Sequence, residues 1–160
     1  MPEVVVPPSP TGGVNAWLRA AHIGPTIAVT VLAGLLAVDW GLPTATVAVL
    51  VAAVLAGQLT IGWGNDLVDA GRDRRVGRRD KPLALGLLDS RRVTAALLLA
   101  LAASVAFSGL LGWRSALAHV VLVIGAGHAY NIGLKATAWS WLPYAVAFGS
   151  LPGVVTLAQA

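Results

Sequence analysis

Cysteine is absent from the 160-residue chain, which excludes disulfides and thiolate metal sites. Charged side chains are also scarce. They make up 11% of the residues, whereas an ordinary globular domain carries about 25%. Hydrophobic residues reach 57%, so too few polar side chains remain to build a water-exposed shell. The composition therefore indicates a protein that lies in a membrane.

The N-terminal segment lacks the basic region that precedes the apolar part of a signal peptide, and four prolines interrupt it. We therefore expect residues 1–15 to form a flexible tail and residues 16–160 to form one membrane domain.

Five apolar stretches follow, and each is near the ~20 residues that a helix needs to cross a bilayer. They cover residues 21–38, 44–63, 92–111, 115–130 and 139–157. Helix is the expected conformation, because backbone groups in lipid must be satisfied within their own segment. The sequence thus predicts an all-α, polytopic transmembrane bundle with about five spanning helices.

Basic residues are concentrated in one loop. Eight of the eleven Lys and Arg lie between Arg72 and Arg92. Arg19 precedes the first stretch and Lys135 follows the fourth, on the same side of the membrane as this loop. The positive-inside rule then predicts a cytoplasmic N-terminus and a cytoplasmic charged loop. Five aspartates lie within this basic window or just before it, which argues against nucleic acid as a partner and leaves anionic ligands or lipids.

Three of these aspartates share one helical face if the second stretch continues as a helix. Asp66, Asp69 and Asp73 fall within about 60° of one another at helical spacing, with Asn65 beside them. Three carboxylates on one face repel each other unless a cation lies among them. Oxygen ligands without His or Cys favour Mg²⁺ over zinc. We therefore expect the three aspartates to bind Mg²⁺.

A basic flank adjoins this acidic face and could supply positive charge to a phosphate group. It consists of Arg72, Arg74, Arg75, Arg78, Arg79 and Lys81. An acidic face beside a basic flank at a membrane surface suggests a lipid diphosphate site. The alternative is that these Asp and Arg side chains only form ion pairs in a solvated loop whose positive charge sets the topology.

The motif from Asn65 to Asp73 resembles the NDxxDxxxD signature of the UbiA-type intramembrane prenyltransferases. The similarity continues in Val76, Arg78, Lys81-Pro82-Leu83 and Gly86, and upstream in Arg19 and Pro25. Tyr130-Asn131-x-x-x-Lys135 resembles the family's YxxxK, with one extra residue between Tyr130 and Lys135. The resemblance covers roughly residues 17–157.

This resemblance implies a Mg²⁺-dependent enzyme that moves a prenyl group from a prenyl diphosphate to a hydrophobic, often aromatic acceptor, as in quinone or prenyl-lipid biosynthesis. Asp66, Asp69 and Asp73 would bind the metal and act in catalysis. The expected substrate-binding residues are Asn65, Arg19, Arg72, Arg78, Arg79, Lys81, Tyr130 and Lys135. For Arg19 and Lys135, a role as topology anchor remains equally open.

The chain departs from the family pattern in one respect. The family carries a second aspartate motif, DxxxD, later in the chain, whereas here no Asp or Glu follows Asp89. Family members are also about twice as long. We therefore expect the chain to be the N-terminal half of such an enzyme, with the second motif on a missing C-terminal half, a second polypeptide or a second copy. The alternative is an inactive remnant or scaffold that at most binds a diphosphate lipid.

The remaining polar residues in the apolar stretches have simpler interpretations. His22, Thr26 and Thr30 recur every fourth residue, with Arg19 on the same face, and such a stripe usually serves helix packing. His119 is expected to be a hydrogen-bonded interior histidine, and His128 to border a cavity near the cytoplasmic end.

Overall fold

The structure is a computed structural model that describes residues 12–158. Its helices are α1 (Val14–Ala20), α2 (Ile23–Asp39), α3 (Thr44–Arg75), α4 (Ser90–Leu110), α5 (Trp113–Leu117), the π-helix η1 (Ala118–Ile124), α6 (Gly125–Ile132), the 3₁₀ helix η2 (Leu134–Ala136) and α7 (Leu142–Thr156). The described part of the chain has no strand, which confirms the all-α prediction. Most of the predicted tail lies outside it, and α1 begins before residue 15.

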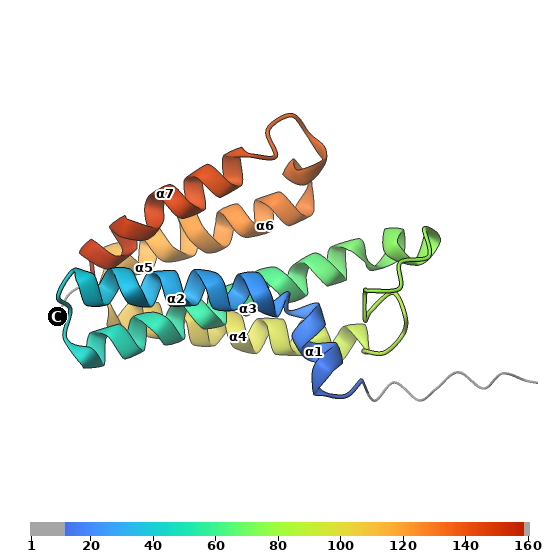
Figure 1. The fold of residues 1–160 in the computed structure, drawn as a ribbon, viewed down its shortest axis with the longest axis horizontal. Coiled ribbons are helices and arrows are strands. Elements are labelled where there is room, and N and C mark those ends of the chain that lie inside the picture. Colours follow the sequence, from blue (N-terminus) through green and yellow to red (C-terminus); the bar gives the residue numbers. More distant parts are fainter. Residues whose placement is uncertain (1–11, 159–160) are drawn as a thin grey trace, which may run out of the picture.

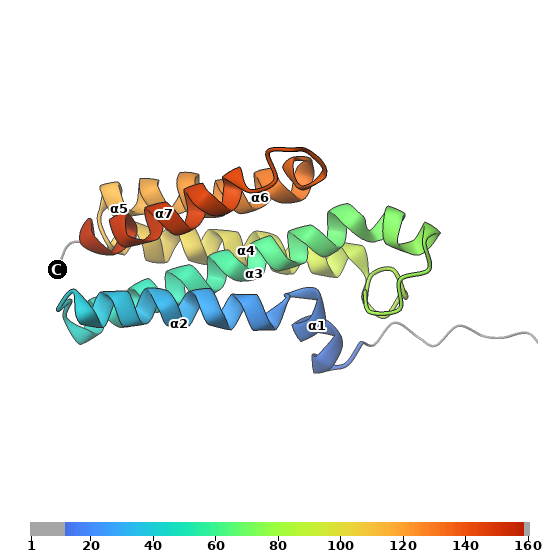
Figure 2. The same ribbon diagram turned by 45° about the horizontal axis from the view of Figure 1, so that its top comes forward.

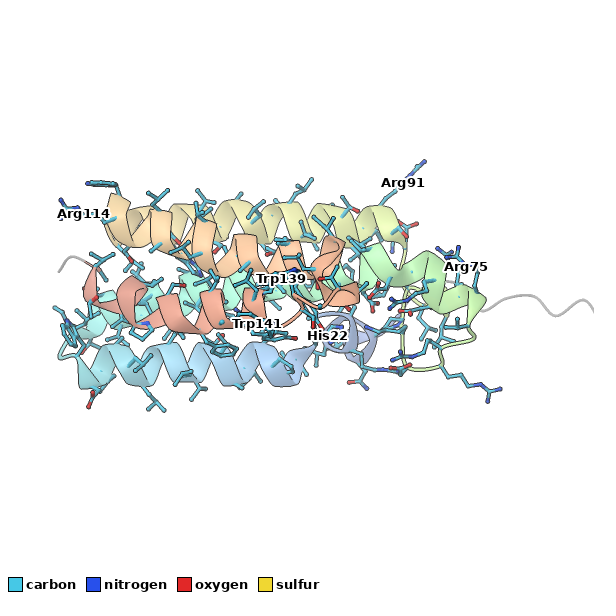
Figure 3. All side chains as sticks on the ribbon, turned by 90° about the horizontal axis from the view of Figure 1, so that it is seen from above. His22, Arg75, Arg91, Arg114, Trp139 and Trp141 are labelled. Atoms are coloured by element: carbon cyan, nitrogen blue, oxygen red, sulfur yellow. The ribbon has the colours of Figure 1, made fainter. Side chains whose placement is uncertain are left out.

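The long helices run side by side along the long axis of the molecule (Figure 1). α3 packs against both α2 and α4, while the continuous rod formed by α5, η1 and α6 packs against α7 (Figure 2). Arg75 and Arg91, which belong to the basic segment between Arg72 and Arg92, lie at one end of the molecule, and Arg114 lies at the other (Figure 3). We call the end that carries Arg75 the charged end.

Within residues 12–158, three helical rods are long and apolar enough to cross a membrane: α3, α4, and the rod from α5 to α6. α1 and α2 together could form a fourth, but they are bent by 67° relative to each other. α7 has 15 residues and is shorter than a typical span. The polytopic membrane fold is therefore supported, while the number of five spans and the cytoplasmic side remain predictions.

The chain breaks between α1 and α2, where the sequence suggested one polar face from Arg19 to Thr30. His22 adopts a left-handed conformation with φ 51° and ψ 55°. Arg19 therefore belongs to a different helix from Thr26 and Thr30, and the prediction of a shared face was wrong. Thr26 and Thr30 do serve packing, since both are buried and donate to backbone carbonyls.

α3 continues through the charged motif, as predicted, and ends at Arg75. Gly77, at φ +69°, follows the helix in the left-handed region that glycine tolerates best. The amide of Arg78 donates to the carbonyl of Asp73 at 2.9 Å and that of Gly77 to Arg74 at 3.3 Å. This pair of hydrogen bonds is a Schellman motif, and it turns the chain back along α3 toward Lys81.

Two apolar clusters hold the helices together. The first, toward the end opposite the charged one, contains Ala33, Ala37, Leu50, Ala53, Val54, Leu111, Leu151, Val155 and Ala158. The second lies beneath the charged end and contains Ala16, Ala20, Ala70, Leu83, Leu88 and Val93. It packs α1 and the loop after α3 against the motif-bearing part of α3, and this packing fixes where Lys81 lies.

Candidate functional site

The three aspartates of the motif are buried on the inner face of α3. Asp66 is 1% exposed, Asp69 7% and Asp73 2%. Because removing a carboxylate from water costs several kcal/mol, each needs a cation or a set of donors nearby. The aspartates are ion-paired, as the alternative interpretation supposed, but they do not lie in a solvated loop.

Asp66 faces the loop that follows α3. Its Oδ1 lies 3.2 Å from Lys81 Nζ, and its Oδ2 accepts a long hydrogen bond of 3.4 Å from the Leu83 amide. The contact between Oδ1 and Lys81 lacks hydrogen-bond geometry, so this oxygen has no hydrogen-bond partner among the described residues. A buried carboxylate oxygen in this state retains the capacity to bind a further cation or donor.

Lys81 joins three parts of the chain. Its ammonium group lies 3.0 Å from His22 Nε2 and 3.3 Å from Asn65 Oδ1, in addition to its ion pair with Asp66. The Lys81 side chain is only 11% exposed. The sequence singled out Lys81 and Asn65 but did not predict the contact with His22.

Asp69 and Asp73 face the turn after α6 and the exposed Arg72. Lys135 Nζ donates to Asp69 Oδ2 at 2.6 Å. Arg72 lies 3.4 Å from Asp69 and 3.8 Å from Asp73. The structure thus brings Lys135, which follows α6, to the motif on α3.

The other predicted cations are less closely involved. Arg78 forms two hydrogen bonds to Asp80, of 2.7 and 2.6 Å, and these bonds hold the pKa of the Asp80 carboxyl well below its usual range. Arg19 donates to the Arg79 carbonyl at 3.3 Å. The Arg78, Arg79 and Arg19 side chains are exposed, and the structure does not bring them onto the aspartate face.

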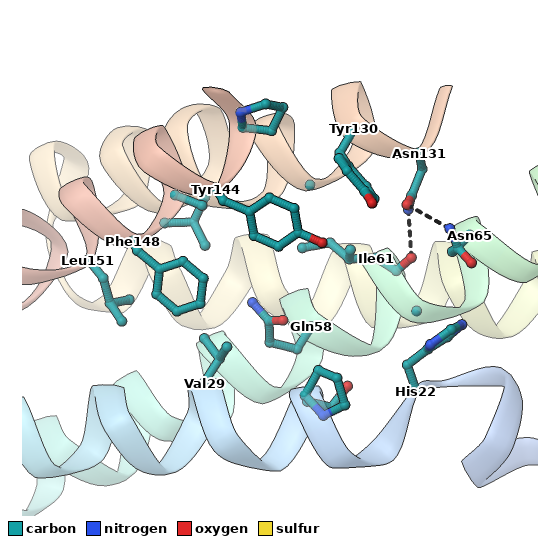
Figure 4. Close-up of a pocket in the computed structure, with 17 residues that line it drawn as sticks. His22, Val29, Gln58, Ile61, Asn65, Tyr130, Asn131, Tyr144, Phe148 and Leu151 are labelled. Atoms are coloured by element: carbon teal, nitrogen blue, oxygen red, sulfur yellow. Dashed lines mark hydrogen bonds between the residues drawn. The ribbon is translucent and has the colours of Figure 1, made fainter. Parts of the chain in front are cut away.

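A cavity of about 370 Å³ adjoins this charged cluster. Its wall is mainly apolar and comes from α2, α3, α6 and α7 (Figure 4). Tyr130, one of the predicted substrate residues, lines it and makes an edge-on contact with Tyr144 at 5.0 Å between ring centroids. Tyr144 and Phe148 also remain 52% and 47% exposed, so the cavity opens to the surface of the bundle.

The cavity and the carboxylates meet at Asn65. Its amide donates to Asn131 Oδ1 at 3.0 Å, while its carbonyl accepts from Lys81. Asn131 in turn donates to the Ile61 carbonyl at 2.8 Å (Figure 4). His22, at the start of α2, also lines the cavity and contacts the same Lys81. A polar boundary of His22, Asn65 and Lys81 therefore separates the apolar cavity from the aspartates.

Sequence reasoning missed several residues of the cavity, among them Gln58, Asn131, Tyr144 and Phe148. Gln58 left a signal, because it is a polar residue in an apolar helix and lies seven residues before Asn65, on the same face. Tyr144 and Phe148 left none that distinguishes them from aromatic residues facing lipid.

The donor set of the site fits Mg²⁺ in its chemistry. All three candidate ligands are carboxylates, and Asp66 Oδ1 is buried with no hydrogen-bond partner in the described part of the chain. Among residues 12–158, however, no group of three His, Asp or Glu side chains is arranged to hold a metal ion. Instead, the ammonium groups of Lys81 and Lys135 lie against the carboxylates of Asp66 and Asp69.

The two histidines of the α5–α6 rod lie outside the cavity. His128 Nε2 is 3.2 Å from the Thr60 hydroxyl. We expected His128 to border a cavity, but it does not line this one. His119 is fully buried, and its Nδ1 lies 2.8 Å from the Ser108 hydroxyl. Its Nε2 has no hydrogen-bond partner in the described structure. The expected hydrogen-bonded interior histidine is therefore hydrogen-bonded through only one of its two ring nitrogens.

A sequence model of the UbiA prenyltransferase family matches residues 23–160. The matched region begins with α2 and includes the three aspartates, the cavity-lining part of α3 and Lys135. No curated protein and no solved structure matches the chain.

Proposed function

The chain belongs to the UbiA prenyltransferase family, and we propose that it takes part in Mg²⁺-dependent transfer of a prenyl group from a prenyl diphosphate to a hydrophobic acceptor. The family implies an intramembrane prenyltransferase in general. The metal, the residues that act and the way they act are our proposal.

One observation supports it most directly: a buried cluster of carboxylates and lysines adjoins an apolar cavity across a thin polar boundary. A prenyl diphosphate has the matching polarity, with a strongly charged head and an apolar chain. Its diphosphate would lie among Lys81, Lys135 and the aspartates, and its chain would lie in the cavity. The allylic carbon would then lie near the boundary formed by His22, Asn65 and Lys81.

Each residue type has a defined part in this reaction. Asp66, Asp69 and Asp73 would hold Mg²⁺, which when bound supplies Lewis-acid charge to the diphosphate. Lys81 and Lys135 donate hydrogen bonds to diphosphate oxygens as negative charge develops on them. The C–O bond breaks with its electron pair on the diphosphate. The acceptor then forms the new bond to the allylic carbon and loses a proton, while the apolar wall keeps water from the cation.

The second aspartate motif of the family would complete the diphosphate site. We propose that these carboxylates come from a second polypeptide or from a further part of the same protein. This proposal accounts for the arrangement on α3, where Asp66 and Asp69 have lysine partners and the carboxylates form no metal site with other described residues.

The test is an assay in liposomes with a labelled prenyl diphosphate, Mg²⁺ and a panel of aromatic and lipid-like acceptors. Asp66→Ala and Asp69→Ala should abolish transfer. Asp39→Ala, an exposed aspartate at the end of α2 far from the motif, is the matched control and should leave transfer unchanged. Unchanged turnover in the Asp66 and Asp69 variants contradicts the assignment. The wild type could also bind the diphosphate without transferring the prenyl group, even after a polypeptide that carries the second aspartate motif is added. That result favours an inactive remnant.

A further inference from the structure

His22 has an unusual backbone conformation. Among residues 12–158 it is the only residue other than glycine with a positive φ, at 51°. A side chain with a Cβ is disfavoured in this region, so such a residue persists only where its surroundings hold it there. An observed outlier of this kind, on the wall of the candidate site, is a reason to ask what the side chain does.

The position of His22 is set by contacts that Gly62 and Thr26 make with the break, mostly at the preceding residue, Ala21. A Cβ added to Gly62 would lie 2.2 Å from the Ala21 carbonyl oxygen, so α3 admits the chain at this point only because residue 62 is glycine. The Thr26 hydroxyl donates to the same carbonyl at 2.9 Å. The Thr26 amide donates to the His22 carbonyl at 3.2 Å. The break between α1 and α2 is thus fixed against α3.

This break directs the His22 imidazole to Lys81. The two nitrogens are 3.0 Å apart, and since an ammonium group can only donate, His22 Nε2 must be the acceptor. We therefore assign a neutral imidazole with its proton on Nδ1. The other two contacts of Lys81 are a hydrogen bond to Asn65 Oδ1 and an ion pair with Asp66 Oδ1, and both residues belong to α3. Among the described residues, His22 provides the polar side-chain contact to Lys81 that comes from outside α3.

We propose that His22 is a positioning residue, which holds the Lys81 ammonium at the cavity boundary where it meets the diphosphate of the donor. This inference rests on the proposed function, in which Lys81 binds that diphosphate. Without the imidazole, Lys81 retains only its contacts to Asn65 and Asp66. The attraction of the Asp66 carboxylate then draws the ammonium toward α3 and away from the cavity.

Two substitutions separate this role from a structural one. His22→Gly removes the acceptor but suits the left-handed backbone, so the fold should be retained. His22→Gln restores an acceptor oxygen near the position of Nε2. In the transfer assay, His22→Gly should raise KM for the prenyl diphosphate about tenfold, as expected for the loss of one hydrogen bond to a charged group. KM for the acceptor and the melting temperature should stay near the wild-type values, and His22→Gln should recover most of the loss.

A double-mutant cycle with Lys81→Met provides the decisive control. If His22 acts through Lys81, His22→Gly should have no further effect on the donor KM in a Lys81→Met background. Equal donor KM in the wild type and His22→Gly overturns the inference, as does an undiminished effect in the Lys81→Met background.

Binding of inorganic pyrophosphate with Mg²⁺, measured by calorimetry, distinguishes this failure from failure of the proposed function. A wild-type protein that neither binds pyrophosphate nor transfers the prenyl group overturns both. A wild-type protein that does both, with His22→Gly binding pyrophosphate equally well, overturns only the role of His22.

Discussion

Lys135 Nζ lies 2.6 Å from Asp69 Oδ2 and joins two positions that are 66 residues apart in the sequence. Both side chains are largely buried, at 14% and 9% exposure. This ion pair ties the turn after α6 to the charged end of α3. It also places a second ammonium group on the aspartate face, opposite the one that Lys81 contributes.

Lys135→Met should lower the free energy of unfolding by about 3 kcal/mol, because it leaves the buried Asp69 carboxylate with only the exposed Arg72. Thermal or denaturant unfolding in detergent would measure the loss. The double variant Lys135→Met/Asp69→Asn is the control. It removes the uncompensated charge and should recover most of the stability. An equally unstable double variant would mean that Lys135 contributes through packing of its aliphatic chain.

Gly62→Ala should destabilise the fold by about 2 kcal/mol, as overpacking does in a close contact. The added Cβ would meet the Ala21 carbonyl oxygen at 2.2 Å and push the α1–α2 break away from α3. Gly149→Ala in α7 is the matched control, since beyond the adjacent residues and the nearby backbone of its own helix no described atom lies within 4 Å of its Cβ position. This control should be neutral or slightly stabilising, because alanine is the better helix former. Similar melting temperatures for the two variants would contradict the close packing at Gly62.

The helical period allowed the central part of the site to be predicted. Asp66, Asp69 and Asp73 lie on one face of a helix that continues from the apolar stretch, and that face is buried. This prediction needed only local information, namely spacing along one helix. The same spacing argument failed at Arg19 and His22, because the helix breaks there.

The break at His22 has a local signal in Pro25. Proline has no amide hydrogen, and in a continuous helix its ring would clash with the carbonyl four residues earlier, which is that of Ala21, where α1 ends. The place of the break against α3 depends on tertiary contact, because Gly62 on another helix admits the chain at Ala21. The contact between His22 and Lys81 was not predictable, since it depends on the break and on the loop after α3 together.

Phe148→Trp should reduce prenyl transfer, because the larger ring takes space from a cavity of about 370 Å³. Phe107→Trp is the matched control: Phe107 on α4 is 37% exposed and does not line the cavity. Binding of pyrophosphate with Mg²⁺ should stay normal in both variants, since neither residue contacts the aspartates. Transfer rates would be measured with donors of increasing prenyl-chain length. The rate of the Phe148→Trp variant should fall most with the longest donor. Equal transfer rates in both variants would mean that the prenyl chain of the donor lies outside this cavity.

Mg²⁺ and pyrophosphate should bind cooperatively. Lys81 and Lys135 lie against the carboxylates of Asp66 and Asp69, so Mg²⁺ alone must displace two ammonium groups from their carboxylate partners. Pyrophosphate alone is repelled by the negative charges of the same carboxylates. Together, the anion accepts from the lysines while the metal neutralises the aspartates.

The melting temperature of the wild type should therefore rise little with either component and markedly with both. A ligand at a hundred times its Kd adds about 2.7 kcal/mol to the unfolding free energy. EDTA should reverse the effect, and Asp66→Asn/Asp69→Asn should abolish it. Asp80→Asn should retain it, because Asp80 is exposed and paired with Arg78. A full shift with Mg²⁺ alone would show that the lysines do not compete for the carboxylates. No shift with both together would mean that the aspartate face does not bind a metal diphosphate.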